Sequence, residues 1–182
     1  MEQKDYKLEI IDVLLKKNWH IRALAQKLKT NHMLVLRRLK ELYDENVVDY
    51  SKEGKNNVYF LKKTPEAKSY IFITENYKLN KLLKKHSFLR KIVEKIQKDK
   101  KIKLAILFGS YVKGLEKKDS DIDIYIETNN KKVKQDLELI DSKINVKIGK
   151  YDKENLLIKE IEKDHVIIKG VEEFYERNNF FD

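Results

Sequence analysis

Two aspartates separated by one residue have the clearest chemical potential in this sequence. Asp121 and Asp123 lie in a β-prone segment, and side chains two positions apart in a strand point to the same face of the sheet. Two neighbouring carboxylates repel each other unless a cation lies between them. An all-oxygen ligand set favours Mg²⁺ over softer metals. The spacing therefore predicts a magnesium site held by Asp121 and Asp123.

A glycine-serine pair is separated from these aspartates by ten residues. Gly109 and Ser110 end the near-continuous apolar run 102–108, which has the length and composition of a buried strand. The chain has only five glycines, and Gly109 and Gly114 both lie between this run and Asp121. The exposed amides of the Gly109-Ser110 turn and the Ser110 hydroxyl are expected to hold phosphate oxygens. A phosphate-binding turn beside a magnesium site predicts metal-assisted transfer of a nucleotidyl group.

The order of these residues resembles that of the nucleotidyltransferase superfamily of polymerase-β-like fold. The pattern is Gly-Ser, a spacer, and Ser120-Asp121-Ile122-Asp123, and it is most similar to the minimal, prokaryotic MNT-type domains. The resemblance runs from about residue 87 to the end of the chain and includes the segment KDHVIIKGVEEFYE. It implies catalytic and metal-binding roles for Asp121 and Asp123, nucleotide binding by Gly109, Ser110 and Lys113, and Mg²⁺ as the cofactor. Lys113 can equally be a solvated loop lysine.

One position departs from the family pattern. Family members supply a third carboxylate from the strand after the next helix, and here a helix expected at about 131–141 precedes a strand at 143–148. By resemblance, Asn145 lies where that aspartate is expected. Asparagine offers a neutral oxygen but supplies neither a base nor a third negative charge. The nucleotide and metal site is therefore expected to persist. Whether the site also catalyses transfer stays an open question at this point.

Three other carboxylates lie near this strand, and two of them are candidate substitutes. Glu127 shares the face of Asp123 but lies ~13 Å further along its strand, which is too far for the same metal. Asp141 and Asp152 flank the strand that carries Asn145. Either one could complete the site.

The first third of the chain predicts three helices and a hairpin. Apolar residues at helical spacing mark helices over 4–17 and 21–28 and a third after its expected N-cap, Asn31, while two β-prone runs flank a turn at 52–57. The stretch IRALAQKLKTNHMLVLRRLKELYDENVVDY resembles the core of a winged helix-turn-helix domain. That resemblance implies a third helix in the major groove and a wing on phosphate. The implied DNA contacts are Asn31, His32, Met33, Arg37 and Arg38 on the third helix, and Lys52 and Lys55 in the wing.

The charge distribution separates the chain into two modules. The 182 residues carry a net charge of +10, and the basic excess lies entirely before residue 102. A basic front half joined to a mildly acidic back half indicates that the first module faces a polyanion. A lysine-rich proteome explains the charge equally well, and winged helices also serve as protein-interaction modules. The chain has no cysteine, which excludes disulfides and Cys-based zinc sites, and no membrane span or signal peptide is expected, so we expect a cytoplasmic protein.

A helical connector is expected between the modules. Thr64 and Pro65 form a strong helix start, and the helical pattern continues to residue 101 with an interruption at His86-Ser87, where Ser87 can cap a second helix. The connector could dimerise, brace the modules or line a nucleic-acid groove. Its candidate buried residues are Tyr70, Ile73, Tyr77, Leu82, Phe88, Ile92 and Ile96.

These expectations define an α/β (α+β) architecture. It consists of a winged helix over 1–63, a connector over 64–86 and a nucleotidyltransferase domain with a small mixed sheet over 87–182. The leading hypothesis is a Mg²⁺-dependent enzyme that transfers NMP from an NTP, ATP foremost, to a hydroxyl acceptor and is coupled to DNA. The alternative is a DNA-binding regulator, or an antitoxin-like protein, whose nucleotidyltransferase domain is degenerate and only binds nucleotide. Duplex DNA, a HEPN-type protein and a second copy of the chain are the candidate macromolecular partners, and no membrane contact is expected.

Overall fold

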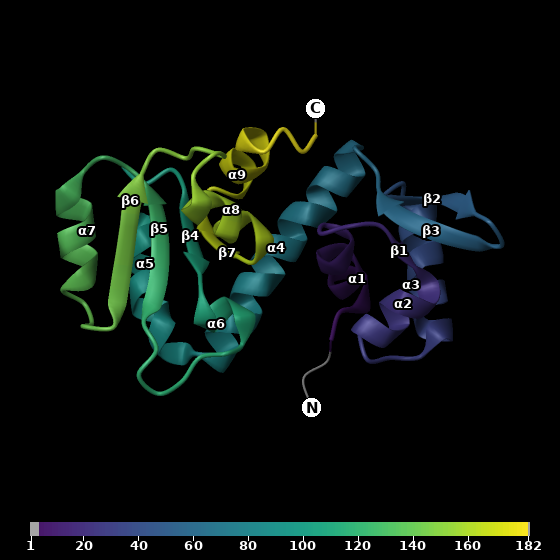
Figure 1. Ribbon diagram of the computed structural model, residues 1–182, viewed down its shortest axis with the longest axis horizontal. Coiled ribbons are helices and arrows are strands. Elements are labelled where there is room, and N and C mark those ends of the chain that lie inside the picture. The colour runs from purple at the N-terminus through teal and green to yellow at the C-terminus, as the bar shows by residue number, and fades with distance from the viewer. Residues whose placement is uncertain (1–3, 182) are drawn as a thin grey trace. The chain divides into compact units, whose positions relative to one another are not determined.

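The computed structural model describes residues 4–181, which divide into two compact units (Figure 1). Unit 1 comprises the described residues up to Tyr77 together with Phe180 and Phe181, and unit 2 spans Lys78–Asn179. Within residues 4–181, none of the helices combines the length and the hydropathy needed to cross a bilayer.

Unit 1 contains three helices and a small antiparallel sheet, followed by the first part of a long helix. Its elements are α1 (Tyr6–Leu14), β1 (Trp19–His20), α2 (Ile21–Lys27), α3 (His32–Asp44), β2 (Val48–Glu53), β3 (Asn56–Leu61) and the start of α4 (Pro65–Lys85). The strands lie in the order β1-β3-β2. Three helices closed by a β2–β3 hairpin form a winged helix, as the sequence predicts. The sequence reading missed β1: Trp19 pairs with Tyr59, and His20 with Val58, where only a helix break was expected.

Side-chain caps begin the helices that matter most for this unit. The Asn31 side chain accepts a hydrogen bond from the Leu34 amide at 2.7 Å, which fixes the start of α3. Thr64 caps α4 through the Ala67 amide at 3.2 Å, with Pro65 in the first helical position. Both predicted caps are confirmed. Between these helices the core is made of fully buried aliphatic side chains, among them Ile10, Ile11, Leu24, Val35, Leu39 and Leu42.

The buried stripe of α4 differs from the predicted one. Ile73 is 49% exposed, whereas Ile71, Thr74 and Glu75 are fully buried. The hydroxyl of Thr74 donates to the Tyr70 carbonyl at 2.8 Å, so the turn before it satisfies this polar group. The helix thus buries Thr74, which hydropathy alone assigns to the surface. The buried face of α4 is therefore rotated away from the face that the sequence predicts.

Two further predictions about the end of α4 are wrong. The helix does end near His86, but a short 3₁₀ turn, η1 (Ser87–Leu89), follows, and its N-cap is His86 without a side-chain hydrogen bond. Ser87 therefore does not cap the next helix. Phe88, expected in the core, is 54% exposed, and Leu89 is buried in its place.

Unit 2 is built around a four-stranded mixed sheet. After η1 its elements are α5 (Arg90–Lys98), β4 (Ala105–Phe108), α6 (Ser110–Lys113), β5 (Ile122–Glu127), α7 (Lys131–Glu138), β6 (Ile144–Gly149), α8 (Leu156–Lys163), β7 (Val166–Lys169) and α9 (Val171–Arg177). The strand order is β6-β5-β4-β7. Strands β5 and β6 are parallel, and β4 is antiparallel to both β5 and β7. The predicted small mixed sheet is confirmed.

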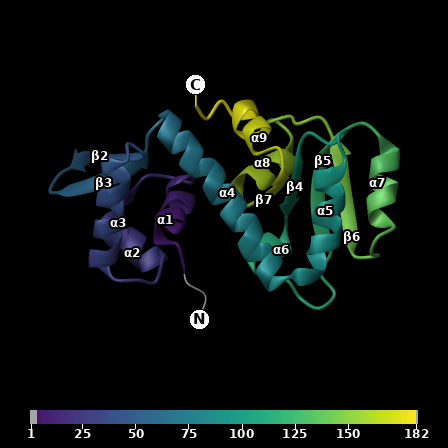
Figure 2. The ribbon, with the colours of Figure 1, turned by 180° about the vertical axis from the view of Figure 1, so that it is seen from behind.

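The two faces of this sheet differ in chemistry. Ile122, Ile124 and Ile126 of β5 belong to one hydrophobic core with apolar side chains of α5 and α7. Figure 2, the view from behind, shows α5 lying across that face. The alternation of β5 puts Asp123 and Tyr125 on the opposite face. The covered face thus holds the strand in place, and the other face presents its carboxylate.

Candidate functional site

The first contact of the site joins Gly109 to Asp123. Phe108, the last residue of β4, pairs with Asp123 of β5, so the chain turns at Gly109 directly beside this carboxylate. Gly109 has φ +76°, and a Cβ at this position would lie 2.5 Å from Asp123 Oδ2. Only glycine permits both the backbone conformation and this approach. The glycine is thus required by a close contact between the turn and the aspartate.

The second contact joins Asp123 to Asn145 on the neighbouring parallel strand. The register pairs these two residues, and the Asn145 side-chain amide donates to Asp123 Oδ1 at 2.8 Å. Burial raises the pKa of Asp123, the bond from Asn145 lowers it, and the negative charge of Asp121 raises it again. The site therefore holds a half-buried carboxylate whose charged form is costly until a cation arrives.

The other predicted site residues are the metal ligand Asp121 and the nucleotide-binding residues Ser110 and Lys113. Asp121 is exposed and immediately precedes β5, while Ser110 begins α6 directly after Gly109. Lys113, at the end of α6, is engaged: its ammonium group forms an ion pair with Glu160 of α8 at 2.8 Å. The structure brings the predicted residues to one end of the sheet but gives Lys113 a protein partner.

Neither the two candidate substitutes, Asp141 and Asp152, nor Glu127 completes a three-carboxylate group with the aspartate pair among residues 4–181. Glu127 accepts two hydrogen bonds from Arg177 of α9, the shorter at 2.5 Å. Asp141 accepts a hydrogen bond from the Lys143 amide, and Asp152 accepts one from the Glu154 amide. Each of the three carboxylates thus serves local structure.

Two charged residues near Asp123 escaped the sequence reading. Lys147 of β6 lowers the pKa of Asp123 and Glu160 raises it, so both lie close enough to act on this carboxylate electrostatically. Lys147 follows Asn145 by two positions, and strand alternation could have placed it on the same face. Glu160 is contributed by α8, and no local pattern indicates it.

The carboxylates fit one divalent cation that is shared with a phosphate ligand. Among residues 4–181 there is no group of three His, Cys, Asp or Glu side chains placed to hold a metal ion. Mg²⁺ is commonly held by one or two carboxylates together with substrate phosphates, and Asp121 and Asp123 supply that number. Their all-oxygen chemistry is suited to this ion.

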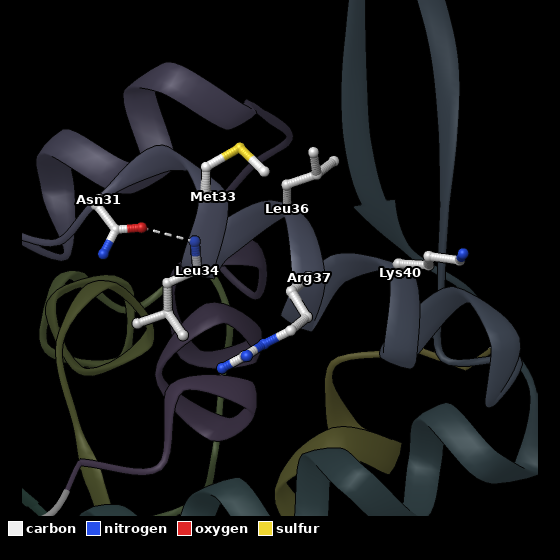
Figure 3. Close-up of a pocket in the computed structure, with 6 residues that line it drawn as sticks. All are labelled: Asn31, Met33, Leu34, Leu36, Arg37 and Lys40. Carbon is white, nitrogen blue, oxygen red and sulfur yellow. Dashed lines mark hydrogen bonds between the residues drawn. The ribbon is translucent and has the colours of Figure 1, made fainter.

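The exposed surface of α3 in unit 1 is the candidate nucleic-acid interface. A groove here is lined by Asn31, Met33, Leu34, Leu36, Arg37 and Lys40 (Figure 3). Figure 3 shows that the Asn31 side-chain oxygen accepts a hydrogen bond from the Leu34 amide. The helix cap therefore uses the same oxygen that would accept a hydrogen bond from a DNA base. Met33 is 68% exposed. The groove combines apolar side chains with the cations of Arg37 and Lys40.

The predicted DNA-contacting cations fall into two groups. Arg38 forms two hydrogen bonds with Glu41 of the same helix at 2.8 and 2.9 Å, so its charge is largely neutralised. Arg37 is exposed and makes no ion pair within the described part of the chain. Lys52 is exposed near the end of β2, Lys55 is exposed in the hairpin turn, and His32 is exposed at the start of α3. Of the two arginines, Arg37 is therefore the better candidate for a contact with DNA.

Comparison with solved structures returns winged helix proteins of low similarity. A homodimeric winged helix-turn-helix DNA-binding domain, Mb0332 of Mycobacterium bovis, is 20% identical over 38% of this chain and 65% of that chain, with a TM-score of 0.35. The transcriptional repressor BigR of Xylella fastidiosa is 15% identical over 48% of this chain and 78% of that chain, also with a TM-score of 0.35. This chain thus spans just under two thirds of the first of these proteins. Scores this low do not establish a shared fold, and the winged helix of unit 1 rests on its own elements.

Comparison with sequences is informative for unit 2. No curated protein matches the chain. Residues 90–178 match the family model described as polymerase beta, nucleotidyltransferase. The matched segment contains the Gly109-Ser110 turn, both aspartates and Asn145. The geometry and the match agree, and residues 90–178 form a nucleotidyltransferase domain of the polymerase beta family.

Proposed function

We propose that unit 2 is a Mg²⁺-dependent nucleotidyltransferase that transfers NMP from an NTP, ATP foremost, to a hydroxyl acceptor, and that unit 1 binds duplex DNA. The contact between Gly109 and Asp123 carries the first part of this proposal. It sets the Gly109-Ser110 turn against a carboxylate of the aspartate pair, Asp121 and Asp123. Phosphate oxygens held by the turn would then share a cation with that pair.

Each residue of the site has a distinct role in this proposal. The aspartate pair would hold Mg²⁺, which would supply the positive charge that balances the phosphates and the departing pyrophosphate. The amides of the Gly109-Ser110 turn and the Ser110 hydroxyl orient the triphosphate. Lys113 would also bind the triphosphate, once a phosphate oxygen replaces Glu160 as the partner of its ammonium group. Orientation by several fixed donors lowers the entropic part of the barrier.

The DNA-binding part rests on α3 and the wing. Arg37 and Lys40 line the groove beside Met33, and Lys52 and Lys55 extend from the hairpin. Cations provide salt-dependent affinity for phosphate, and apolar side chains contact thymine methyl groups in the major groove. This surface therefore suits duplex DNA.

A second candidate function is favoured by Asn145. Its amide occupies Asp123 Oδ1, and residues 4–181 contain no three-carboxylate group. Ground-state binding of a nucleotide needs fewer charged groups than stabilisation of the transition state. The chain would then be a DNA-binding regulator that senses a nucleotide. A HEPN-type partner and a second copy of the chain stay predictions.

One experiment separates these candidates. The full-length protein is incubated with Mg²⁺ and α-³²P-ATP, alone and with duplex DNA, alongside Asp123→Asn and the matched control Asp119→Asn, which changes an exposed loop aspartate. We expect transfer of label in the wild type and the control and loss of transfer in Asp123→Asn. Binding of ATP without transfer under every condition would favour the sensor. Absence of both ATP binding and transfer would contradict the proposed function altogether.

A further inference from the structure

Three charged side chains act electrostatically on Asp123. Asp121 precedes β5, Lys147 lies on β6, and Glu160 lies on α8. The ion pair with Lys113 already neutralises Glu160. Lys147 is exposed and forms no ion pair with a described residue. Among the described residues around Asp123, Lys147 is thus the cation left to balance the aspartate pair.

Both oxygens of Asp123 are constrained. Oδ1 accepts the hydrogen bond from Asn145, and Oδ2 lies against the backbone of Gly109. Sites with two cations hold them about 3.5–4 Å apart, and such pairs are held by carboxylates that contact both ions. Here the amide of Asn145 takes the side of Asp123 that faces β6, where another carboxylate would have to approach. The ligand set therefore supports one cation.

Lys147 is placed to reach a phosphate bound at this site. It lies two residues beyond Asn145 on the same strand face, a separation of roughly 6.6 Å along the strand. Its register partner is Tyr125, which follows Asp123 by two residues on β5. A lysine ammonium on a flexible four-carbon stem covers that distance and carries a compact positive charge.

We propose that the nucleotide site takes up one divalent cation and that Lys147 supplies, at the phosphates, the positive charge of a second one. This inference rests on the proposed function, because it assumes a nucleotide on the aspartate pair. In this proposal Lys147 is the phosphate-binding lysine. It forms no ion pair with a described residue, so it can bind a phosphate without first breaking another contact. Lys113 must first leave Glu160.

The test counts cations and measures nucleotide affinity without requiring turnover. The full-length protein is dialysed to equilibrium with Mn²⁺ and α,β-methylene-ATP, whose α–β bridge resists transfer, and bound Mn²⁺ and bound nucleotide are measured per chain. We expect one Mn²⁺ for each bound nucleotide in the wild type. We expect two in the double variant Asn145→Asp with Lys147→Ala, which gains a carboxylate and loses the competing charge. Lys147→Ala alone should bind the nucleotide about tenfold more weakly, whereas the control Lys150→Ala, which changes an exposed lysine beyond β6, should bind it as the wild type does.

The outcomes separate this inference from the proposed function. Two Mn²⁺ ions per nucleotide in the wild type would overturn the inference and leave the nucleotidyltransferase proposal intact. Unchanged nucleotide affinity in Lys147→Ala would overturn the role of this lysine. Failure of the wild type to bind α,β-methylene-ATP at any Mn²⁺ concentration would contradict both. The wild-type stoichiometry decides the matter even where the double variant does not fold.

Discussion

The Asn145 amide donates a hydrogen bond to Asp123 Oδ1 at 2.8 Å across two parallel strands. A neutral donor thus stands beside the carboxylate at the position where the family resemblance implies a third acid. The bond stabilises the charged form of Asp123, because it opposes the effect of burial on the pKa. It also withholds from the site the negative charge that a second cation would need.

Replacing Asn145 by aspartate should therefore increase transfer. In Asn145→Asp the new carboxylate repels Asp123 in the absence of metal and gains a cation in its presence. We expect the rate of label transfer from α-³²P-ATP to rise roughly tenfold, equivalent to about 1.4 kcal/mol in the barrier. The thermal midpoint should fall without Mg²⁺ and recover when Mg²⁺ is added. Asn129→Asp, which adds the same charge in the loop after β5, serves as the control, and an equal gain there would contradict a local role for position 145.

Replacing Gly109 should be costly for two reasons that can be measured separately. Gly109 has φ +76° and ψ −149°, which essentially only glycine adopts, and a Cβ there would lie 2.5 Å from Asp123 Oδ2. Gly114 is in the ordinary left-handed region and its Cβ would meet nothing, so Gly114→Ala should cost about 1 kcal/mol. Gly109→Ala should cost roughly 1–3 kcal/mol for the backbone and roughly 1–3 kcal/mol for overpacking, and should weaken Mg²⁺-ATP binding.

Chemical unfolding followed by far-ultraviolet circular dichroism, with calorimetry for the nucleotide, measures both effects. Repeating Gly109→Ala in the Asp123→Ala background isolates the contact. An equal cost in the two backgrounds would show that the carboxylate contact has no energetic weight.

The two neighbouring arginines of α3 should differ in their effect on DNA binding. Arg37 is exposed and has no ion pair among the described residues, whereas Arg38 is held by Glu41. Arg37→Ala should weaken binding of a duplex by the full-length protein and reduce the slope of log K against log salt concentration by about 1. Arg38→Ala should change the slope less. Fluorescence anisotropy between low and moderate salt tests this, and a salt-independent constant would favour a protein-interaction role for unit 1.

The acid stability of unit 1 depends on Glu45. The hydrogen bond from Lys7 at 2.6 Å lowers the pKa of Glu45 below its ordinary value of 4.5, and a second bond from Tyr70 lowers it further. A lowered carboxyl pKa contributes stability that is fully present above about 4.5 and is lost as the pH falls through the folded-state value. Glu45→Gln should therefore cost about 0.2–1 kcal/mol at pH 7, the range for an exposed ion pair, and almost nothing at pH 3.

Trp19 makes this measurement specific to unit 1. It is the only tryptophan of the chain and lies in β1, so its fluorescence during urea unfolding reports on this unit. Glu53→Gln in the wing is the matched control and should behave as the wild type does at both pH values. A cost that is independent of pH in Glu45→Gln would contradict the role of its charge.

The parts of the structure that sequence predicts are those decided within a few residues. Asn31 and Thr64 cap helices because the groups they bind lie three positions away. The hairpin follows from its turn residues, and the polar face of β5 follows from the alternation of side chains along the strand. The gap at 18–20 between the first two expected helices gives no sign of a strand, because the strand partner of Trp19, Tyr59, lies on a distant segment. Helical spacing places Ile73 in the core, and the structure exposes it, because hydropathy does not show which face of a helix meets its neighbours.

The candidate site follows the same division. Alternation predicted that Asp121 and Asp123 share a face, and family resemblance directed attention to Asn145. The contact of Gly109 with Asp123 needs the antiparallel register of β4 and β5, which single-strand patterns do not provide. The ion pair of Lys113 joins residues 47 positions apart, so the sequence offered no reason to prefer Lys147.

The closeness of Gly109 to Asp123 makes the two positions dependent on each other during mutation. While an aspartate occupies 123, any side chain at 109 meets a carboxylate, and glycine is the acceptable residue. After Asp123→Ala that obstacle is gone, but the backbone at 109, with φ +76° and ψ −149°, still favours glycine. The metal ligand thus adds a second constraint to a position that the turn already restricts. A lineage that abandoned the cation would lose the clash and keep the backbone requirement, and saturation mutagenesis of 109 in the two backgrounds would display this as weaker selection against substitution, with glycine preferred in both.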